Sequence, residues 1–295
     1  MNPRGAFAGL STIDLTYHVA AMPPPNAKLV ADEQELSAGG PAANAAVAFA
    51  YLGGQARLIT GVGQHPVTAI IRDDLSRFRV ALEDLAPTAS EAPPLSSIFA
   101  IGNTGARSIV SASRALRSLD YAAFRPAVLD DCTFLLVDGH YMPLAIAAAS
   151  AARARGMRVI LDGGSWKDGL PDLLPLVDTA ICSADFRVPG YEGEDAVADF
   201  LRGCGISEVA ITRGHSAIRF WCPSAAGEVA VPQVDAADTS GAGDIFHGAF
   251  CFYACEPGAT FQDALAKAAV VASESCRHIG TRAWMRHWGK PAGAA

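Results

Sequence analysis

The chain contains the stretch Asp238-Thr239-Ser240-Gly241-Ala242-Gly243-Asp244, which leads directly into an apolar run over residues 245–250. Small residues where a loop turns into a helix leave several backbone N–H groups unpaired and pointing the same way. The helix dipole adds partial positive charge, so this turn suits an anion such as a phosphate. Asp244 places a carboxylate inside that anion site, which makes chemical sense if it removes a proton from a hydroxyl that then attacks phosphorus. The alternative is a tight strand-to-helix turn in which Asp244 is only an N-cap.

The composition is that of a globular protein. The 295 residues are 51% hydrophobic and 18% charged, which is enough for one large core or a core with a small appendage. The net charge is −7 and the basic residues are scattered, so we expect no nucleic-acid partner. No apolar stretch approaches the roughly 18 residues of a membrane span, and residues 1–15 lack a signal peptide, so we expect no membrane partner. The seven cysteines form no C-x-x-C pair, so we expect no metal site. Their odd number and lack of a disulfide pattern favour a reducing, cytoplasmic location.

Short apolar runs alternate with helical stretches through the second half of the chain. We expect strands over 134–138, 158–162, 179–182 and 208–212, and helices over 142–155 and 195–202. This alternation is typical of an α/β fold, with a central, mainly parallel sheet and helices on both faces. Ligands bind such sheets at the carboxyl ends of the strands, where several of these runs end in Asp, Gly or Ser.

Two segments break the alternation. Residues 15–37 contain three consecutive prolines and strand-like pieces, and residues 95–113 alternate around the turn 102–105. We interpret both as antiparallel elements outside the main sheet, which together form a small flap over the crevice. The alternative is two unrelated surface excursions.

A second glycine-containing segment, Gly39-Gly40-Pro41-Ala42-Ala43-Asn44, opens an alanine-rich helix that Gly53 and Gly54 end. Gly39 and Gly40 allow a ligand to approach the backbone closely. Asn44 is the one polar side chain in this apolar helix. It is either a ligand contact or a buried amide bonded to backbone.

Together, the segments at 39–44 and 238–244 resemble the two signatures of the ribokinase-like (PfkB) carbohydrate kinase family, and the resemblance extends over residues 5–282. It implies an ATP-dependent kinase that phosphorylates a sugar hydroxyl. It also implies a single catalytic domain over 1–295, folded as a three-layer sandwich with a β-lid formed by 15–37 and 95–113. The wording of both signatures is most similar to the ketohexokinase branch, which favours a ketose.

The resemblance also implies roles for individual residues. Asp244 matches the general base, and the backbone of Gly241, Ala242 and Gly243 matches the anion hole. Residues that match the sugar site are Asp14, Gly39, Gly40 and Asn44. Residues that match the nucleotide site are Ser183, Thr212, Gly214, Ala269 and Ser273, the last two in an adenine pocket. Mg²⁺ would bridge phosphate oxygens, and Asp238 matches a site for a monovalent cation such as K⁺.

The sequence departs from the family pattern at three places. The usual Asn-x-x-Glu motif reads Ser183-Ala184-Asp185-Phe186, so its Glu is missing and Asp185 stands one residue out of register. Ketohexokinase-type members have a similar Ser-x-Asp form. The turn after Gly63 continues with Gln64-His65-Pro66 instead of acidic residues, and residues 281–295 fit the family poorly.

Three further side chains are candidates for substrate contact. Lys28 and Arg107 lie in the predicted lid and could reach an anionic group on a substrate, although solvated charges on strand edges are the simpler interpretation. His140 follows a strand end and either lines the sugar site or supports it by hydrogen bonding. His247, just after the catalytic turn, is expected to pack within its own helix.

Two other functions are compatible with these motifs. A nucleoside kinase of the same fold would need an aromatic stacking partner in the lid, for which Tyr17 and Phe99 are the candidates. A catalytically weak sugar- or nucleotide-binding protein would explain the missing Asn-x-x-Glu motif. Exposed lid edges also predict a homodimer that forms through the lid.

Overall fold

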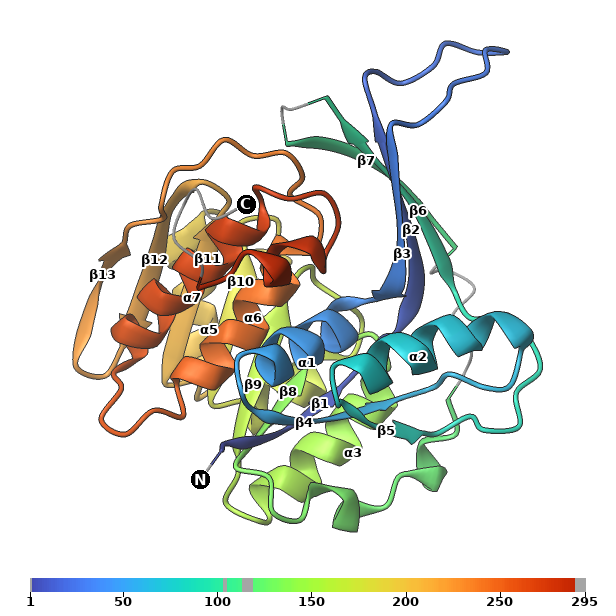
Figure 1. Cartoon of the computed structure of the whole chain (residues 1–295). Coiled ribbons are helices and arrows are strands. Elements are labelled where there is room, and N and C mark those ends of the chain that lie inside the picture. The colour runs from blue at the N-terminus through green and yellow to red at the C-terminus, as the bar shows by residue number, and fades with distance from the viewer. Residues whose placement is uncertain (1, 103–104, 113–118, 290–295) are drawn as a thin grey trace.

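A nine-stranded sheet forms the centre of the computed structural model, which describes residues 2–102, 105–112 and 119–289 (Figure 1). Its order is β13-β12-β11-β10-β9-β8-β1-β4-β5. The strands are β1 (Arg4–Ala8), β4 (Gln55–Thr60), β5 (Ala81–Asp84), β8 (Phe134–Val137), β9 (Arg158–Gly163), β10 (Thr179–Ser183), β11 (Glu208–Arg213), β12 (Ser216–Cys222) and β13 (Ala225–Val229). The only antiparallel contacts among the described strands of this sheet are those of β12 with β11 and with β13, at one edge. The four predicted strands and the mainly parallel sheet are confirmed.

Helices cover both faces of this sheet. One face carries α1 (Pro41–Tyr51), α2 (Ala69–Arg77), α6 (Ala242–Tyr253) and α7 (Phe261–Ser275), and the other carries α3 (Met142–Arg153), α4 (Leu170–Leu173) and α5 (Glu194–Gly203). Alternate residues of each strand feed the two hydrophobic cores. In β8, for example, Leu136 joins the core under α1 and α6, whereas Leu135 and Val137 join the core under α3. The predicted three-layer sandwich is confirmed. Short 3₁₀ turns lie at Pro66–Thr68, Tyr121–Ala123, Pro126–Leu129, Leu174–Leu176 and Ala283–Arg286.

A second sheet, which we call the lid, rises from one side of the main sheet (Figure 1). Its order is β3-β2-β6-β7, with β2 (Thr12–Val19), β3 (Glu33–Gly39), β6 (Leu95–Ile101) and β7 (Ala106–Ser111). β6 and β7 fall within the predicted segment 95–113, whereas β2 and β3 extend beyond the predicted 15–37 at both ends. Asn103, Thr104 and residue 113 lie outside the described residues. Within each segment the strands pair antiparallel, as predicted, β2 with β3 and β6 with β7. The contact between the two segments, β2 with β6, is parallel. Both leave the same edge of the main sheet, after β1 and β5, and therefore run in the same direction.

The departure at Gln64-His65-Pro66 has a local explanation. The Asp84 carboxylate accepts hydrogen bonds from the backbone N–H groups of Val62 (2.9 Å), Gly63 (3.1 Å) and Ala86 (3.0 Å). Burial alone would raise the pKa of Asp84, but these N–H groups and Arg72 lower it overall. His65 then caps the 3₁₀ turn at Pro66, because its ring Nδ1 accepts from Val67 N at 3.3 Å. Asp84 thus stabilises this turn without the usual acidic residues.

Within the described part of the chain, none of the helices has both the length and the apolar character that a membrane crossing requires.

Candidate active site

The turn at 241–243 has the geometry of an anion site. Gly241 is left-handed, with φ 67°, and serves as the N-cap of α6, so the first N–H groups of the helix have no partner within it. A Cβ on Gly241 would lie 2.6 Å from Thr281 Cγ2, which explains the glycine. A Cβ on Gly243, by contrast, would meet no atom within 4 Å. The turn is therefore closed at Gly241, against the C-terminal segment, and open at Gly243.

Asp244 stands in the first turn of α6 beside this anion site. Its Oδ2 accepts a hydrogen bond from Asn44 Nδ2 at 2.8 Å, which joins the two sequence signatures across 200 residues. Burial raises the pKa of Asp244 to about 7; Asp162 and Asp14 add to the rise, and Asn44 and His247 oppose it. A carboxylate with this pKa is suited to accept a proton near neutral pH.

Asp14 lies on β2, on the face of the lid that is buried. Its Oδ1 accepts from Thr12 Oγ1 at 2.7 Å, and burial raises its pKa. A Cβ on Gly39 would lie within 2.2 Å of the Asp14 carboxyl group, so only glycine fits on the neighbouring strand. Gly40, with φ 90°, would bring a Cβ within 2.5 Å of the Leu10 carbonyl oxygen. These two glycines therefore allow the chain around β2 and the start of α1 to approach closely beside the Asp14 carboxylate.

Asp138, just after β8, is a buried carboxylate that the sequence analysis did not single out. It accepts hydrogen bonds from the backbone N–H groups of Leu10 (2.8 Å), Ala42 (3.2 Å) and His140 (2.9 Å). It therefore fixes the loop after β1 to the first turn of α1. His140 is half-buried beside it, and a direct role for His140 in sugar binding stays a prediction.

Asp162, near the end of β9, forms a second group that was missed, together with His247. His247 Nδ1 lies 2.7 Å from the Gly243 carbonyl oxygen and 3.5 Å from Asp162 Oδ2, and its Nε2 lies 3.2 Å from the Ile181 carbonyl oxygen. His247 therefore bonds within its own helix, as expected, and in addition links α6 to β9 and β10. Burial raises the pKa of Asp162, and the charge of His247 opposes that rise. A carboxylate at a predicted strand end was the one available signal for both Asp138 and Asp162.

The predicted nucleotide residues lie further along the sheet. Ser183 and Thr212 face each other in register at the carboxyl ends of β10 and β11, and Gly214 follows with φ 61°. Asp185 is exposed, and its backbone N–H donates to Ser183 Oγ at 3.1 Å. On α7, Ser273 is buried and Ala269 belongs to the hydrophobic core. An adenine pocket built from these two residues stays a prediction.

The outer strand of the lid, β7, contacts the signature loop, which is the loop of the second family signature at 238–241. Arg107 on β7 donates to Thr239 Oγ1, which itself donates to the Gly105 carbonyl oxygen at 3.0 Å, and Gly105 forms a β-bridge with Asp238. Arg107 is therefore more than a solvated edge charge. Lys28 is exposed in the loop between β2 and β3, which projects away from the main sheet (Figure 1).

The Asp238 carboxylate is buried and accepts from the backbone N–H groups of Ser240 (2.8 Å) and Gly280 (2.9 Å). It thereby ties the signature loop to the C-terminal segment. A monovalent cation at Asp238 stays a prediction, as does a homodimer through the lid.

The lid aromatics lie away from Asp14. Tyr17 and Phe99 stack on each other, with ring centroids 5.9 Å apart and an angle of 23° between the planes. Because side chains alternate along a strand, Tyr17 is on the opposite face of β2 from Asp14, and Phe99 pairs with it in register. These rings are thus not placed to stack on a ligand held by Asp14.

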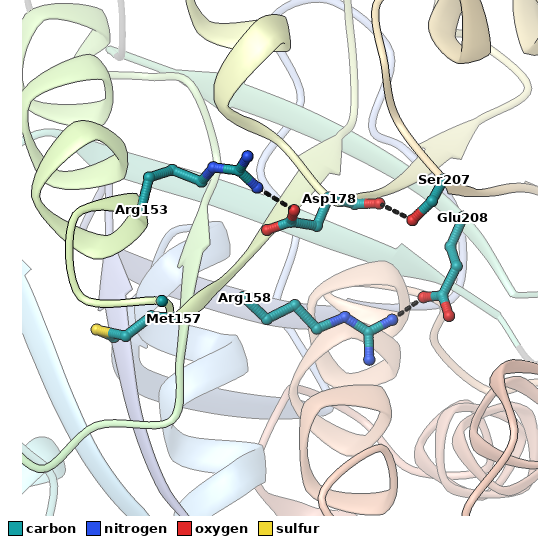
Figure 2. A pocket seen from close by; sticks show the side chains of 7 residues that line it. Arg153, Met157, Arg158, Asp178, Ser207 and Glu208 are labelled. Atoms are coloured by element: carbon teal, nitrogen blue, oxygen red, sulfur yellow. Dashed lines mark hydrogen bonds and ion pairs between the residues drawn. The ribbon is translucent and has the colours of Figure 1, made fainter.

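A cavity of about 530 Å³ lies at the opposite edge of the sheet, where β9 and β11 begin. Its charged side chains pair with one another, Arg153 with Asp178 and Arg158 with Glu208 (Figure 2). None of the predicted site residues lines it. The predicted residues Ser183 and Thr212 lie at the other ends of the strands, where β10 and β11 finish.

Comparison with known proteins identifies the family of this chain. A model of the pfkB family carbohydrate kinases matches residues 6–288. The chain is 24% identical over 262 residues to a ribokinase of Staphylococcus aureus (strain COL), covering 85% of this chain and 86% of the relative. It is 24% identical over 294 residues to a deoxyribokinase of Salmonella typhi, covering 94% of both chains. The structure of Arabidopsis thaliana ribokinase complexed with ribose and ATP superposes with a TM-score of 0.78 at 21% identity, covering 95% of this chain and 94% of that one. Since the family model spans nearly the whole chain and the fold agrees, this protein belongs to the pfkB family of carbohydrate kinases and is a phosphotransferase.

Proposed function

We propose that this kinase transfers the γ-phosphate of ATP to a hydroxyl of a small sugar, with Asp244 as the general base. The observation that carries the proposal is the position of Asp244. Its carboxylate lies in the first turn of α6, next to the open anion turn, and Asn44 of the other signature donates a hydrogen bond to it. Base and phosphoryl site thus adjoin, as in-line transfer to a hydroxyl requires.

Two carboxylates would divide the work on the sugar. Asp14, buried on the inner face of the lid, would accept hydrogen bonds from sugar hydroxyls and hold the ring. Asp244 would take the proton of the attacking hydroxyl on Oδ1, because its Oδ2 already accepts the Asn44 amide. The backbone N–H groups of residues 241–243 would then stabilise the charge that develops on the phosphoryl oxygens.

The protein side of the nucleotide site suits a magnesium ion that is held mainly by phosphate and water. Among the described residues, no group of three or more His, Cys, Asp or Glu is arranged to hold a metal. Mg²⁺ commonly keeps several waters and binds through one or two carboxylates plus substrate phosphates. Asp185, exposed after β10, would be the carboxylate that contacts its water shell. When bound, Mg²⁺ neutralises charge on the phosphates.

We favour a ketose as the substrate, because the residues of the two signatures are most similar to those of the ketohexokinase branch. The relatives named ribokinase and deoxyribokinase support a small sugar and add pentoses to the candidates. The stacked pair Tyr17 and Phe99, on the far face of the lid, gives the nucleoside alternative no support. The hydrogen-bonded Asp244 likewise favours an active kinase over a binding protein.

The decisive experiment measures ADP release with Mg-ATP against ketoses, pentoses, other aldoses, anionic sugars and nucleosides. We expect turnover on one sugar class, and a loss of roughly two to four orders of magnitude in Asp244→Asn, the scale of a general base. Asp199→Asn, an exposed change on α5, is the matched control and should leave turnover unchanged. Near-normal turnover of Asp244→Asn would refute the role of Asp244. Turnover only on nucleosides would refute the substrate class.

A further inference from the structure

Arg282, in the C-terminal segment after α7, makes contacts next to the proposed general base. Its guanidinium donates to Asp74 Oδ2 from Nε (3.1 Å) and Nη2 (3.0 Å), to the Ala38 carbonyl oxygen (2.8 Å) and to Asn44 Oδ1 (2.9 Å). The side chains of Arg282 and Asp74 are only 10% and 9% exposed. One buried guanidinium thus connects α2, the base of lid strand β3 and α1.

The contact with Asn44 determines which way its amide points. A guanidinium can only donate, so the Asn44 atom facing Arg282 must be the oxygen. The Nδ2 group then faces Asp244, where it donates to Oδ2 at 2.8 Å. Without Arg282, the amide is free to rotate and to turn its oxygen toward the Asp244 carboxylate, which would repel it.

Arg282 also orders the residue that packs against the anion turn. Its Nη1 donates to Thr281 Oγ1 at 2.9 Å, and Thr281 Cγ2 occupies the space that a Cβ on Gly241 would need. The C-terminal segment therefore contacts both the general base, through Asn44, and the phosphoryl-binding turn, through Thr281. A guanidinium with so many fixed partners loses little freedom when the sugar binds.

We propose that Arg282 is a positioning residue for phosphoryl transfer, which holds the Asn44 amide so that it orients the Asp244 carboxylate toward the sugar hydroxyl. This inference rests on the proposed role of Asp244 as the base. It concerns a residue outside both family signatures, and Asp74 is the second member of the device because it holds the guanidinium in place.

The expected signature is in the turnover number and its pH dependence. The groups that face Asp244 are Asn44 from α1, Asp162 from β9, His247 from α6 and Asp14 from β2. Asn44 favours the charged form of Asp244, so losing its N–H raises the pKa of Asp244 and moves the acidic limb of the kcat profile to higher pH. Arg282 also lowers the pKa of Asp14 through its charge, an effect that has to be separated from the first.

The test compares Arg282→Met and Arg282→Lys with wild type on the substrate found in the ADP-release panel. We expect kcat to fall roughly ten- to a hundredfold in Arg282→Met, the scale of a small misplacement at the reacting centre. Arg282→Lys keeps the charge but cannot bridge Asp74 and Asn44 together, so its kcat should lie between those of wild type and Arg282→Met. Arg286→Met, an exposed arginine one turn further on, is the control and should retain full turnover.

A double-mutant cycle with Asn44→Ala decides whether Arg282 acts through Asn44. We expect Arg282→Met to lower kcat and shift the acidic limb in the wild-type background, and to do neither in Asn44→Ala. If both changes persist in Asn44→Ala, Arg282 acts through its charge or through stability, and the inference is overturned. Wild-type kcat in Arg282→Met overturns it too, while an inactive Asp244→Asn would still support the proposed base. If Arg282→Met fails to fold, Asp74→Asn and Arg282→Lys carry the same cycle.

Discussion

The two halves of the proposed active site, a sugar side and a nucleotide side, are built differently. On the sugar side, Asp14 and Asp244 are surrounded by residues from several elements and are held by hydrogen bonds to Thr12 and Asn44. On the nucleotide side, Ser183 and Thr212 are half-buried at adjacent strand ends, and Asp185 is exposed. The difference indicates that the fold holds the side chains of the sugar side in fixed positions. On the nucleotide side, backbone groups would make more of the contacts with the phosphates.

The sharpest way to break this comparison is to change Asp14 to Asn, which keeps its size and removes its charge. A hydrogen bond to a charged group contributes about 1.5–3 kcal/mol. With two sugar hydroxyls affected, the loss is about 3–6 kcal/mol, so kcat/KM for the sugar should fall by roughly two to four orders of magnitude. Steady-state kinetics with each substrate varied in turn will check this, and KM for ATP should stay near wild type. An equal loss in both substrates would contradict a fixed sugar side.

A smaller effect is expected from pH. Burial, together with Asp162 and Asp14, raises the pKa of Asp244 to about 7. The base must be deprotonated, so kcat/KM for the sugar should fall about tenfold per pH unit below that value and level off above it. A profile measured from about pH 5 to about pH 9 tests this sign. The residual rate of Asp244→Asn should lack this limb, and a wild-type profile that stays flat down to pH 5 would argue against Asp244 as the titrating group.

The smallest effect is expected on the nucleotide side. Asp185→Asn removes an exposed carboxylate that would contact the metal only through water, so kcat should change by less than about threefold. The apparent affinity for Mg²⁺, from ADP release at varied magnesium, should weaken only slightly. A loss as large as that of Asp14→Asn would mean that Asp185 replaces the missing glutamate as a direct ligand, and that the two halves are equally fixed.

Local patterns in the sequence were enough to predict the core of the fold. The apolar runs at 134–138, 158–162, 179–182 and 208–212 appear as adjacent parallel strands, because buried strands need continuous apolar residues. The lid strands also fall where their alternation predicted. The antiparallel pairing within each segment was predicted as well. The parallel contact of β2 with β6 was not, because it depends on where two distant segments leave the main sheet.

The catalytic signatures were readable because each is contiguous. The residues that hold these signatures in place could not be predicted in the same way, because each contact joins two distant parts of the chain. Arg282 bonds to Asn44 across 238 residues, and Asp138 bonds to Leu10 across 128. The contacts of His247 outside its helix were not predicted, because its partner Ile181 lies on β10, far away in the sequence. Single side chains of this kind carry no periodicity and no motif, so only the folded chain reveals them.

The buried pair of Arg282 and Asp74 has a consequence for how this lineage can change. A guanidinium that loses its carboxylate in a nearly dry site is costly, and so is the lone carboxylate. A substitution of either residue alone should therefore be selected against. We expect Arg282 and Asp74 to be gained together and lost together. We expect related chains to carry both or neither, with Asn44 present in either case, so that the pair marks a branch within the family rather than the family as a whole.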